Sequence, residues 1–368
     1  MKVMTIVGTR PEIIRLSCTI QRLDELFDHV LVHTGQNFDY ALNEIFFEDL
    51  GLRKPDHDLA VDPSSLGRVL GETLIKTEEV ILAEQPDAVL VLGDTNSCIA
   101  AVMAKRMRIP VYHMEAGNRC FDENVPEEAN RRLVDHVADF NLVYTEHARR
   151  NLLAEGIHPR RILLTGSPMR EVLEQYREQI ESSDVLERLQ LSDRSYFLVS
   201  AHREENVDSP ERLEQLLACL DAVHDRWQMP VIVSTHPRTR KRLEERGSEV
   251  SGDIRWLDPF GFHDYNHLQV HAACVLSDSG TISEEASILS FRAVTLRDSI
   301  ERPEALDAGA IILTGLNAED VVRAVGVAMA EDLVSTPAGY EIEDTSRRVA
   351  KFFLSTARRH QDWAGIRP

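Results

Sequence analysis

The sequence predicts an α/β protein made of two doubly wound, Rossmann-like domains that face a cleft. Short apolar runs rich in Val, Ile and Leu alternate with longer helical patterns, and strands that are apolar throughout are typical of parallel sheets covered on both faces. This alternation pauses in an acidic, loop-prone stretch at residues 179–195 and then restarts, which indicates a second domain of similar size. A chain of 368 residues is long enough for two domains.

Each half contains a series of expected strands, most of them followed by a helical pattern such as those at residues 40–50 and 95–107. In the first half the strands are expected at residues 2–7, 29–35, 87–94, 110–117, 141–145 and 161–166. In the second half they are expected at residues 196–202, 230–236, 254–259, 274–280, 293–298 and 310–315. We therefore expect an N-terminal domain over residues 1–170 and a C-terminal domain over residues 171–345, with a last helix at 346–368 that packs back on the first domain.

Composition argues against several classes of function. The formal net charge of −20 argues against non-specific binding to nucleic acid, although local arginines can still hold a small phosphorylated ligand. The five cysteines are scattered without a C-x-x-C pair and the histidines lack ligand spacing, so we expect neither a disulfide framework nor a metal site. No apolar run approaches the roughly 20 residues of a membrane helix, and the first residues lack a signal-peptide pattern, so we expect a cytoplasmic protein.

Small and polar residues stand where the expected strands end. Ligands of doubly wound sheets bind outside the carboxyl ends of the strands, so these positions are the candidate site. They are Gly8-Thr9-Arg10, Gly93-Asp94, Glu115-Ala116-Gly117, Ala201-His202-Arg203, Thr235-His236 and Ser277 to Gly280. No G-x-G-x-x-G motif or P-loop follows an expected strand, so the sequence indicates neither a nicotinamide dinucleotide nor ATP hydrolysis, and we expect no cofactor.

The stretch "VLSDSGTISEEAS" reads as a strand, a turn and the start of a helix. Ser279, Gly280 and Thr281 at the helix start offer backbone N–H groups and hydroxyls to an anion such as a phosphate. Glu285, one turn further along, is suited to accept hydrogen bonds from the two hydroxyls of a ribose. The alternative is an ordinary capped helix with a solvated acidic first turn.

The turn "GTRPE" is a second candidate for phosphate binding. Gly8 permits a tight turn and Pro11 suits the first helical position, which leaves Arg10 at the end of the strand. A guanidinium at that point can hold a phosphate through two hydrogen bonds, and Arg15 follows about one turn later. The alternative is a pair of solvent-facing arginines.

Three acids and a histidine are candidates for proton transfer. Asp94 and Glu115 end two expected strands, and Glu127 begins the helical run "PEEANRRLVDH". Carboxylates that are crowded together near a bound sugar have pKa values pushed apart, which suits acid/base work. Taken separately, each is better explained as a helix cap or an ion-pair partner. His202, where a strand leads into "REEN", is suited to bind a phosphate or to protonate a leaving group.

Eight segments, in this order, resemble the non-hydrolysing UDP-N-acetylglucosamine 2-epimerase family: "GTRPEIIR", "LGDTNS", "HMEAGNR", "VPEEANRRLVDH", "TGSP", "SAHREEN", "SDSGTISEEA" and "RDSIERPEALDAG". The resemblance spans Gly8 to Gly309. It implies a fold of the glycosyltransferase B type, a homodimer, and a UDP-sugar in the cleft between the domains. It also implies the reaction, in which UDP is eliminated to leave a sugar unsaturated between carbons 1 and 2 and is then added back, with the proton returned to the other face.

Carried over motif by motif, the resemblance gives each candidate residue a role. Arg10, His202, Ser279 and Thr281 would hold the diphosphate, with Gly280 in the same turn and Arg15 nearby. Glu285 would bind the ribose and Arg302 would support UDP. Asp94, Glu115 and Glu127 would be the acid/base set, with His202 assisting, and the face that each carboxylate serves stays open.

Several positions depart from the family pattern. Arg15 stands where the family usually has lysine, and its serine-glycine-glycine turn is here Ser279-Gly280-Thr281. Family members that are activated by their own substrate have a glutamine-histidine-arginine-glutamate run after the second strand. In this sequence the run is Gln36-Asn37-Phe38-Asp39, which argues against such activation. Together with the segments "HMEAGNRCFD" and "SAHREEN", these departures resemble a subgroup that interconverts UDP-2-acetamido-2,6-dideoxy-L-talose and UDP-N-acetyl-L-fucosamine for capsule or O-antigen synthesis.

That pair of sugars is the predicted substrate, and UDP-N-acetylglucosamine with UDP-N-acetylmannosamine is the alternative. A hydrolysing 2-epimerase, a glycosyltransferase of the same fold and a non-catalytic nucleotide-sugar sensor are the competing classes.

Overall fold

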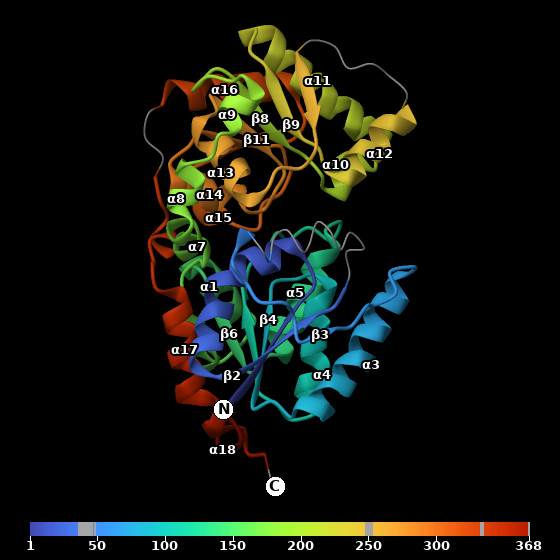
Figure 1. Ribbon diagram of the computed structural model, residues 1–368, viewed down its shortest axis with the longest axis vertical. Coiled ribbons are helices and arrows are strands. Elements are labelled where there is room, and N and C mark those ends of the chain that lie inside the picture. Colours follow the sequence, from blue (N-terminus) through green and yellow to red (C-terminus); the bar gives the residue numbers. More distant parts are fainter. Residues whose placement is uncertain (36–46, 48, 247–252, 332–334, 367–368) are drawn as a thin grey trace. The chain divides into compact units, whose positions relative to one another are not determined.

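The computed structural model describes residues 1–35, 47, 49–246, 253–331 and 335–366. The chain divides into two compact units, each drawn in Figure 1. Unit 1 consists of Met1–Glu174 and Ala338–Pro368, and unit 2 consists of Gln175–Pro337. The sequence predicts the two domain boundaries at residues 170 and 345.

Unit 1 is built on a parallel sheet whose strands run in the order β3-β2-β1-β4-β5-β6-β7. Apart from β3, these are the strands predicted for the first half of the chain; β3 was missed because it is only two residues long. The strands are β1 (Lys2–Val7), β2 (Asp28–His33), β3 (His57–Asp58), β4 (Ala88–Leu92), β5 (Val111–Met114), β6 (Phe140–Val143) and β7 (Ile162–Leu164).

Helices of unit 1 alternate with these strands in the chain, as expected for βαβ units. They are α1 (Arg10–Leu26), α3 (Leu66–Glu84), α4 (Ala100–Arg106), α5 (Pro126–Val137), α6 (Glu146–Ala154), α7 (Met169–Gln175), α17 (Thr345–Thr356) and α18 (His360–Ala364), with a 3-10 turn, η1, at Asn96–Ile99. Most of the helical pattern expected at 40–50 lies outside the described residues.

Helix α17 packs beside α1 in unit 1 (Figure 1). The Phe353 ring lies 6.3 Å from that of Phe27 and 4.1 Å from that of Tyr112, centroid to centroid. The hydroxyls of Tyr112 and Thr356 are 2.6 Å apart and share a hydrogen bond. The C-terminal segment therefore completes the core of unit 1.

Unit 2 is built on a second parallel sheet, of order β10-β9-β8-β11-β12-β13. Its strands are β8 (Phe197–Ser200), β9 (Val231–Ser234), β10 (Ile254–Leu257), β11 (Cys274–Ser277), β12 (Ala293–Thr295) and β13 (Ile312–Leu313). Its helices are α8 (Arg177–Glu181), α9 (Val185–Leu189), α10 (Glu204–Val207), α11 (Pro210–Trp227), α12 (Pro237–Arg246), α13 (Phe262–His271), α14 (Ile282–Leu289), α15 (Pro303–Asp307) and α16 (Ala318–Ala330).

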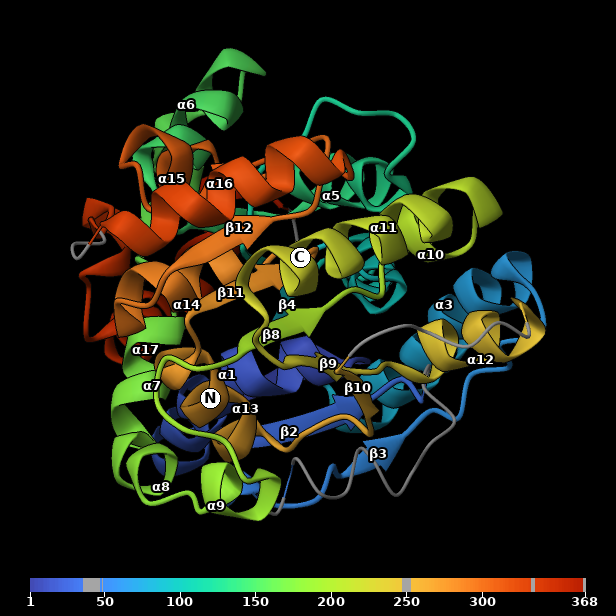
Figure 2. The same cartoon turned by 90° about the horizontal axis from the view of Figure 1, so that it is seen from above.

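Alternating residues of the unit 2 strands belong to two separate cores. Val199 and Val233 pack in a cluster with α11 and α16, which lie side by side (Figure 2). Leu198 and Ile232 pack in a second cluster with residues of α13 and α14. Neighbouring residues of a strand point to opposite faces, so this sheet is covered on both sides, as the apolar strands predicted.

Both sheets reverse their strand order at one point. In unit 1, β1 lies between β2 and β4, and in unit 2, β8 lies between β9 and β11. The carboxyl ends on either side of such a switch point form the ligand-binding crevice of doubly wound sheets. The two parallel sheets confirm the predicted fold class, and among the described residues no helix has the length and apolarity to cross a bilayer.

Candidate active site

In unit 1, Asp94 and Glu115 follow the adjacent strands β4 and β5, and Arg131 of α5 joins them. Nη2 of Arg131 forms an ion pair with Oδ2 of Asp94 and lies 3.1 Å from Oε1 of Glu115. Nη1 of the same guanidinium donates a hydrogen bond to the carbonyl oxygen of Glu115. Two of the three predicted acid/base carboxylates are therefore brought together, and we call Asp94 and Glu115 the carboxylate pair.

The two members of the carboxylate pair have different surroundings. Glu115 is held between two guanidiniums, because Nη1 of Arg15 pairs with its Oε2 while Arg131 contacts its Oε1. Its side chain is 4% exposed, whereas that of Asp94 is 17% exposed. Glu115 also adopts a left-handed backbone conformation with φ of 62°, which is uncommon for a residue with a Cβ and is typical of functional positions.

Arg15 is buried, so the alternative of a solvent-facing arginine is wrong at this position. Arg10 is the first residue of α1 and is half-buried. Glu127 lies in the first turn of α5, one helical turn before Arg131 and so on the same face of the helix. Its neighbour Glu128 is buried and receives hydrogen bonds from Nε of Arg132 and the N–H of Cys120, a structural role.

Glu12, which the sequence analysis did not single out, connects the turns that follow β1 and β4. Its Oε2 accepts hydrogen bonds from the N–H groups of Gly8 (2.8 Å) and Thr9 (2.7 Å), and its Oε1 accepts from the hydroxyls of Thr95 (3.1 Å) and Ser97. Burial raises the pKa of Glu12 above its ordinary value, although these hydrogen bonds oppose the shift. The pattern T-x-x-E, a capping box, was the available signal.

A second buried network supports the end of β5. Asp135 of α5 accepts hydrogen bonds from the N–H of Gly117, lies 2.9 Å from Nδ1 of His113, and pairs with Arg119 at 2.7 Å. Burial opposes ionisation, but His113 and the arginine charges hold the pKa of Asp135 below its ordinary value. His113 in turn contacts the carbonyl oxygen of Gly93 at 2.7 Å. These residues fix the backbone on which the carboxylate pair stands.

In unit 2, Asp278 connects the ends of the adjacent strands β8 and β11. Its fully buried carboxylate accepts hydrogen bonds from the N–H groups of His202 (3.0 and 3.1 Å) and Arg203 (3.0 Å) and from Nδ2 of Asn206 (3.1 Å). Nδ1 of His202 lies 3.4 Å from the same carboxylate. The His202 side chain itself is 37% exposed, and its ring centroid lies 5.5 Å from that of His236.

Ser279, Gly280 and Thr281, which we call the Ser279 turn, lie between β11 and α14, as the strand–turn–helix pattern predicted. The hydroxyls of Ser279 and Thr281 are 2.9 Å apart, and the N–H of Thr281 donates to Oγ of Ser279 at 3.3 Å. Helix α14 begins at the next residue, so its positive end stands at this turn. Oxygen atoms and N–H groups of the turn are thus gathered at a helix start, which suits an anion.

Two arginines stand beside Gly280. Nη1 of Arg302 donates to the Gly280 carbonyl oxygen at 2.9 Å, and an added Cβ on Gly280 would lie 2.9 Å from that nitrogen and 3.4 Å from Nη2 of Arg203. Arg302 is itself held by Glu284, whose Oε2 is 3.2 Å from Nε, and Arg203 lies 3.5 Å from Oε1 of Glu301. The structure therefore brings His202, Arg302 and the Ser279 turn to one edge of the unit 2 sheet.

Glu284 and Glu285 are both buried, so the alternative of a solvated acidic first turn is wrong. Glu284 pairs with Arg302, a role that the sequence analysis missed. Oε2 of Glu285 accepts a hydrogen bond from Nε2 of Gln269 at 2.7 Å. Binding of a ribose by Glu285 stays a prediction.

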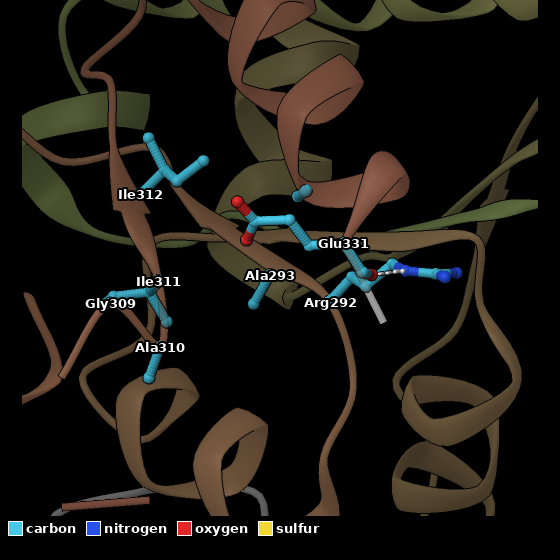
Figure 3. Close-up of a pocket in the computed structure, with 8 residues that line it drawn as sticks. Arg292, Ala293, Gly309, Ala310, Ile311, Ile312 and Glu331 are labelled. Atoms are coloured by element: carbon cyan, nitrogen blue, oxygen red, sulfur yellow. Dashed lines mark hydrogen bonds between the residues drawn. The ribbon is translucent and has the colours of Figure 1, made fainter. Parts of the chain in front are cut away.

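A small hollow in unit 2 lies away from these residues (Figure 3). Arg292, Gly309, Ala310 and Glu331 are among the residues that line it, and Nε of Arg292 donates to the carbonyl oxygen of Glu331 at 3.0 Å. Arg292 and Gly309 precede β12 and β13, so the hollow is at the amino ends of these strands. The Ser279 turn stands at the opposite, carboxyl edge of the sheet, where ligands of such folds bind.

Some sequence-based expectations remain open. Within the part of the chain that the structure describes, no group of three or more His, Cys, Asp or Glu side chains is arranged to hold a metal ion. The departure noted at Gln36, Asn37, Phe38 and Asp39 lies outside the described residues.

The arrangement offers two kinds of chemistry. In unit 1, a pair of carboxylates bound by arginines is suited to proton transfer. In unit 2, arginines, a histidine and a helix start are suited to a phosphorylated ligand and to charge that develops on it.

Comparison with known proteins points to one family. A family model described as UDP-N-acetylglucosamine 2-epimerase matches residues 21–354. The chain is 39% identical over 336 residues to the UDP-N-acetylglucosamine 2-epimerase of Methanocaldococcus jannaschii, covering 89% of this chain and 92% of that protein. It is 34% identical over 357 residues to the UDP-2,3-diacetamido-2,3-dideoxy-D-glucuronate 2-epimerase of Pseudomonas aeruginosa, covering 96% and 99%.

Solved structures of the same family are also similar to this chain. The UDP-N-acetylglucosamine 2-epimerase of Rickettsia bellii has a TM-score of 0.92 at 45% identity and covers 98% of each chain. The M. jannaschii enzyme in complex with UDP-GlcNAc and UDP has a TM-score of 0.91 at 36% identity, covering 97% of this chain and 100% of that one. The rhamnosyltransferase SpnG, at 10% identity and a TM-score of 0.53 over 99% and 100% of the two chains, shares the fold alone, which is of the glycosyltransferase B type.

Proposed function

The chain belongs to the UDP-N-acetylglucosamine 2-epimerase family, whose members are isomerases, and from this premise we propose that it inverts carbon 2 of a UDP-N-acetylhexosamine by elimination and re-addition of UDP. Carbon 2 of such a sugar has no adjacent carbonyl, so its proton is not acidic enough for simple removal. Elimination of UDP gives a 2-acetamido sugar unsaturated between carbons 1 and 2. Addition of UDP, with the proton returned to the other face, completes the inversion without a nicotinamide.

This reaction sets requirements that the residues of unit 2 meet. Negative charge grows on the departing diphosphate, and fixed N–H groups and guanidiniums stabilise such charge most when they are in place beforehand. We assign the diphosphate to His202, Ser279, Gly280 and Thr281, with Arg302 held beside them by Glu284. Glu285 would accept hydrogen bonds from the ribose.

Unit 1 supplies the groups for proton transfer and further positive charge. Inversion needs a group that removes the proton and a group that returns it on the opposite face, hence at least two acid/base groups. The observation that carries the proposal is the ion-pair network in which Arg131 joins Asp94 to Glu115. Glu127 is the third member of the set, and Arg10 and Arg15 are proposed to contact the departing UDP.

Two pairs of sugars are candidate substrates. The relatives named as UDP-N-acetylglucosamine 2-epimerases support UDP-N-acetylglucosamine and UDP-N-acetylmannosamine. The departures at Arg15 and Thr281 and the run "HMEAGNRCFD" favour the 6-deoxy pair, UDP-2-acetamido-2,6-dideoxy-L-talose and UDP-N-acetyl-L-fucosamine, with a place in capsule or O-antigen synthesis. The P. aeruginosa relative supports the idea that this fold accepts sugars other than N-acetylglucosamine.

Incubation of the protein with each UDP-N-acetylhexosamine in heavy water tests the proposal. A 2-epimerase incorporates deuterium at carbon 2 and produces the second sugar of the pair without loss of UDP. Absence of exchange with every sugar of the panel, including the UDP-L-sugars, would refute it. Accumulation of free UDP in step with turnover would indicate hydrolysis, and transfer to an acceptor would indicate a glycosyltransferase.

The resemblance also implies a cytoplasmic homodimer. Sedimentation of the purified protein at several concentrations tests the dimer. A single species with the mass of one chain, 41.7 kDa, would contradict it.

A further inference from the structure

We propose that Asp278 is a positioning residue that holds His202 and the backbone of its turn in the geometry that binds the diphosphate. The inference rests on the proposed function, because it concerns the diphosphate site of unit 2. It assigns a role to the acid that precedes Ser279, Gly280 and Thr281, the residues of the turn that were assigned to the ligand.

The contacts of Asp278 are concentrated on one neighbouring segment. Its carboxylate accepts from two consecutive backbone N–H groups, those of His202 and Arg203, and from the Asn206 side chain, all within 3.1 Å. Asn206 is anchored in turn, since Nδ2 also donates to the Leu296 carbonyl oxygen and Oδ1 accepts from Arg212. One carboxylate therefore fixes the path of the chain from the end of β8 into α10.

The same residue joins that segment to the Ser279 turn. Asp278 directly follows β11 and directly precedes Ser279, and β8 pairs with β11 in the sheet. Its N–H donates to the Ser200 carbonyl oxygen at 3.1 Å. Main chain and side chain of one residue thus tie both segments of the diphosphate site together. His202 and the Ser279 turn cannot move apart without breaking these bonds.

The position and charge of Asp278 argue for this role against a role as a ligand. A carboxylate beside a diphosphate repels it, and this one is fully buried and covered by donors. Such a group is useful to an anion site only through what it orients, because hydrogen bonds to a buried charge are strong and directional. Nδ1 of His202, 3.4 Å away, is turned toward the carboxylate, so the same group also bears on the orientation of the imidazole ring.

Asp278→Asn tests the role with little change in volume. An asparagine offers one oxygen and one NH₂ group, so the NH₂ must face a backbone N–H that donates to the carboxylate in the wild type. Electrostatics alone predicts tighter UDP binding, because a negative charge is removed near an anion. Loss of positioning predicts weaker binding, by roughly tenfold or more, the effect typical of residues that orient a ligand-binding side chain.

Titration calorimetry with UDP and ligand-observed NMR with uridine give the decisive comparison. We expect Asp278→Asn to weaken UDP while uridine binding is unchanged, because only UDP carries the diphosphate. Val223→Ala, which opens a gap in the buried core of unit 2 away from the turn, is the destabilised control and should bind both ligands normally. Asn206→Ala removes one hydrogen-bond donor to the carboxylate and leaves Asp278 in place, so it should weaken UDP binding less than Asp278→Asn does, with uridine binding unchanged. It replaces Asp278→Asn in the test if that variant does not fold.

Each other outcome decides against the inference. UDP binding that is unchanged or tighter in Asp278→Asn overturns it, as does a parallel loss of UDP and uridine or an equal loss of UDP in Val223→Ala. If neither wild type nor variants bind UDP, the proposed function itself is refuted. If wild type binds UDP and exchanges deuterium while the variants match it, only the positioning role falls.

Discussion

Nη2 of Arg131 lies 3.1 Å from the Glu115 carboxylate and also pairs with Asp94, so one guanidinium joins two strand ends of unit 1. We expect Arg131→Lys to lower turnover by about 10²-fold, because a lysine is a point charge on a flexible stem and cannot reproduce two ion pairs and a hydrogen bond to the backbone. UDP affinity should stay near that of the wild type, because Arg131 is not among the residues assigned to UDP. Deuterium exchange at carbon 2 and calorimetry with UDP measure the two quantities.

The adjacent arginine is a matched control for that experiment. Arg132 pairs with Glu128 on the same helix and its side chain is 46% exposed. Arg132→Lys should therefore exchange deuterium at the wild-type rate. Equal activity of the two variants would mean that the bridge between Asp94 and Glu115 is not needed.

Replacing the acid/base carboxylates by their amides should slow the reaction, whereas UDP should still bind. Asp94→Asn and Glu127→Gln each remove a group that can carry a proton, which typically costs 10²–10⁴-fold. Glu123→Gln, at an exposed position in the loop before α5, is the control and should be unaffected. Normal turnover in both Asp94→Asn and Glu127→Gln would remove these residues from the mechanism.

Gly280→Ala should weaken UDP binding by displacing an arginine. The added Cβ would lie 2.9 Å from Nη1 of Arg302 and 3.4 Å from Nη2 of Arg203, which is too close for the first contact. A fivefold or greater loss of affinity, about 1 kcal/mol, is the expected result in calorimetry. Gly326→Ala in α16, where the nearest atom is 3.9 Å away, should instead keep UDP affinity and stabilise the fold by about 0.5–1 kcal/mol.

The stability contribution of Glu12 should depend on pH. Its pKa is raised by burial, so its contribution is fully present below the pKa of an unfolded glutamate, about 4.3, and is lost as the pH rises through the raised value. The free energy of unfolding of the wild type minus that of Glu12→Gln should therefore fall as the pH rises. Urea unfolding at a series of pH values measures this difference. A difference that is flat or that rises would contradict the prediction.

Helix α17 should contribute strongly to the stability of unit 1. Phe353 is fully buried against Tyr112 and Phe27, so Phe353→Ala is expected to cost about 3–5 kcal/mol. Leu354, the next residue, is 59% exposed, and Leu354→Ala should change the free energy of unfolding by about 0.5 kcal/mol or less. Similar unfolding midpoints for the two variants would show that α17 adds little to the core.

Apolar patterning predicted the fold, because a strand buried on both faces must be apolar throughout. That constraint marks β4, β5, β8 and β11 clearly, and their carboxyl ends locate Asp94, Glu115, His202 and Ser279. The two-residue strand β3 carries too little pattern to be recognised.

The supporting residues could not be predicted in the same way. Glu12, Asp278 and Glu284 stand at or just before the starts of helices, and Arg131 lies within α5; charged residues are common at such positions on the surface. Their burial depends on partners from distant segments, such as Ser97 for Glu12 and Arg302 for Glu284. The T-x-x-E spacing indicated the capping role of Glu12 at the start of α1, but only the folded chain brings the distant partners together, so spacing carries no signal for those contacts.

The return of the chain to unit 1 after unit 2 has a consequence for synthesis on the ribosome. Every strand of unit 1 emerges early, but α17, which covers Tyr112 and Phe27, is made only after Pro337. The nascent chain can therefore complete the core of unit 2 first. Until α17 is made, the aromatic side chains of unit 1 that it covers stay exposed and can associate with other chains. A translation product that stops before Thr345 carries all the candidate catalytic residues and yet lacks the last piece of their scaffold.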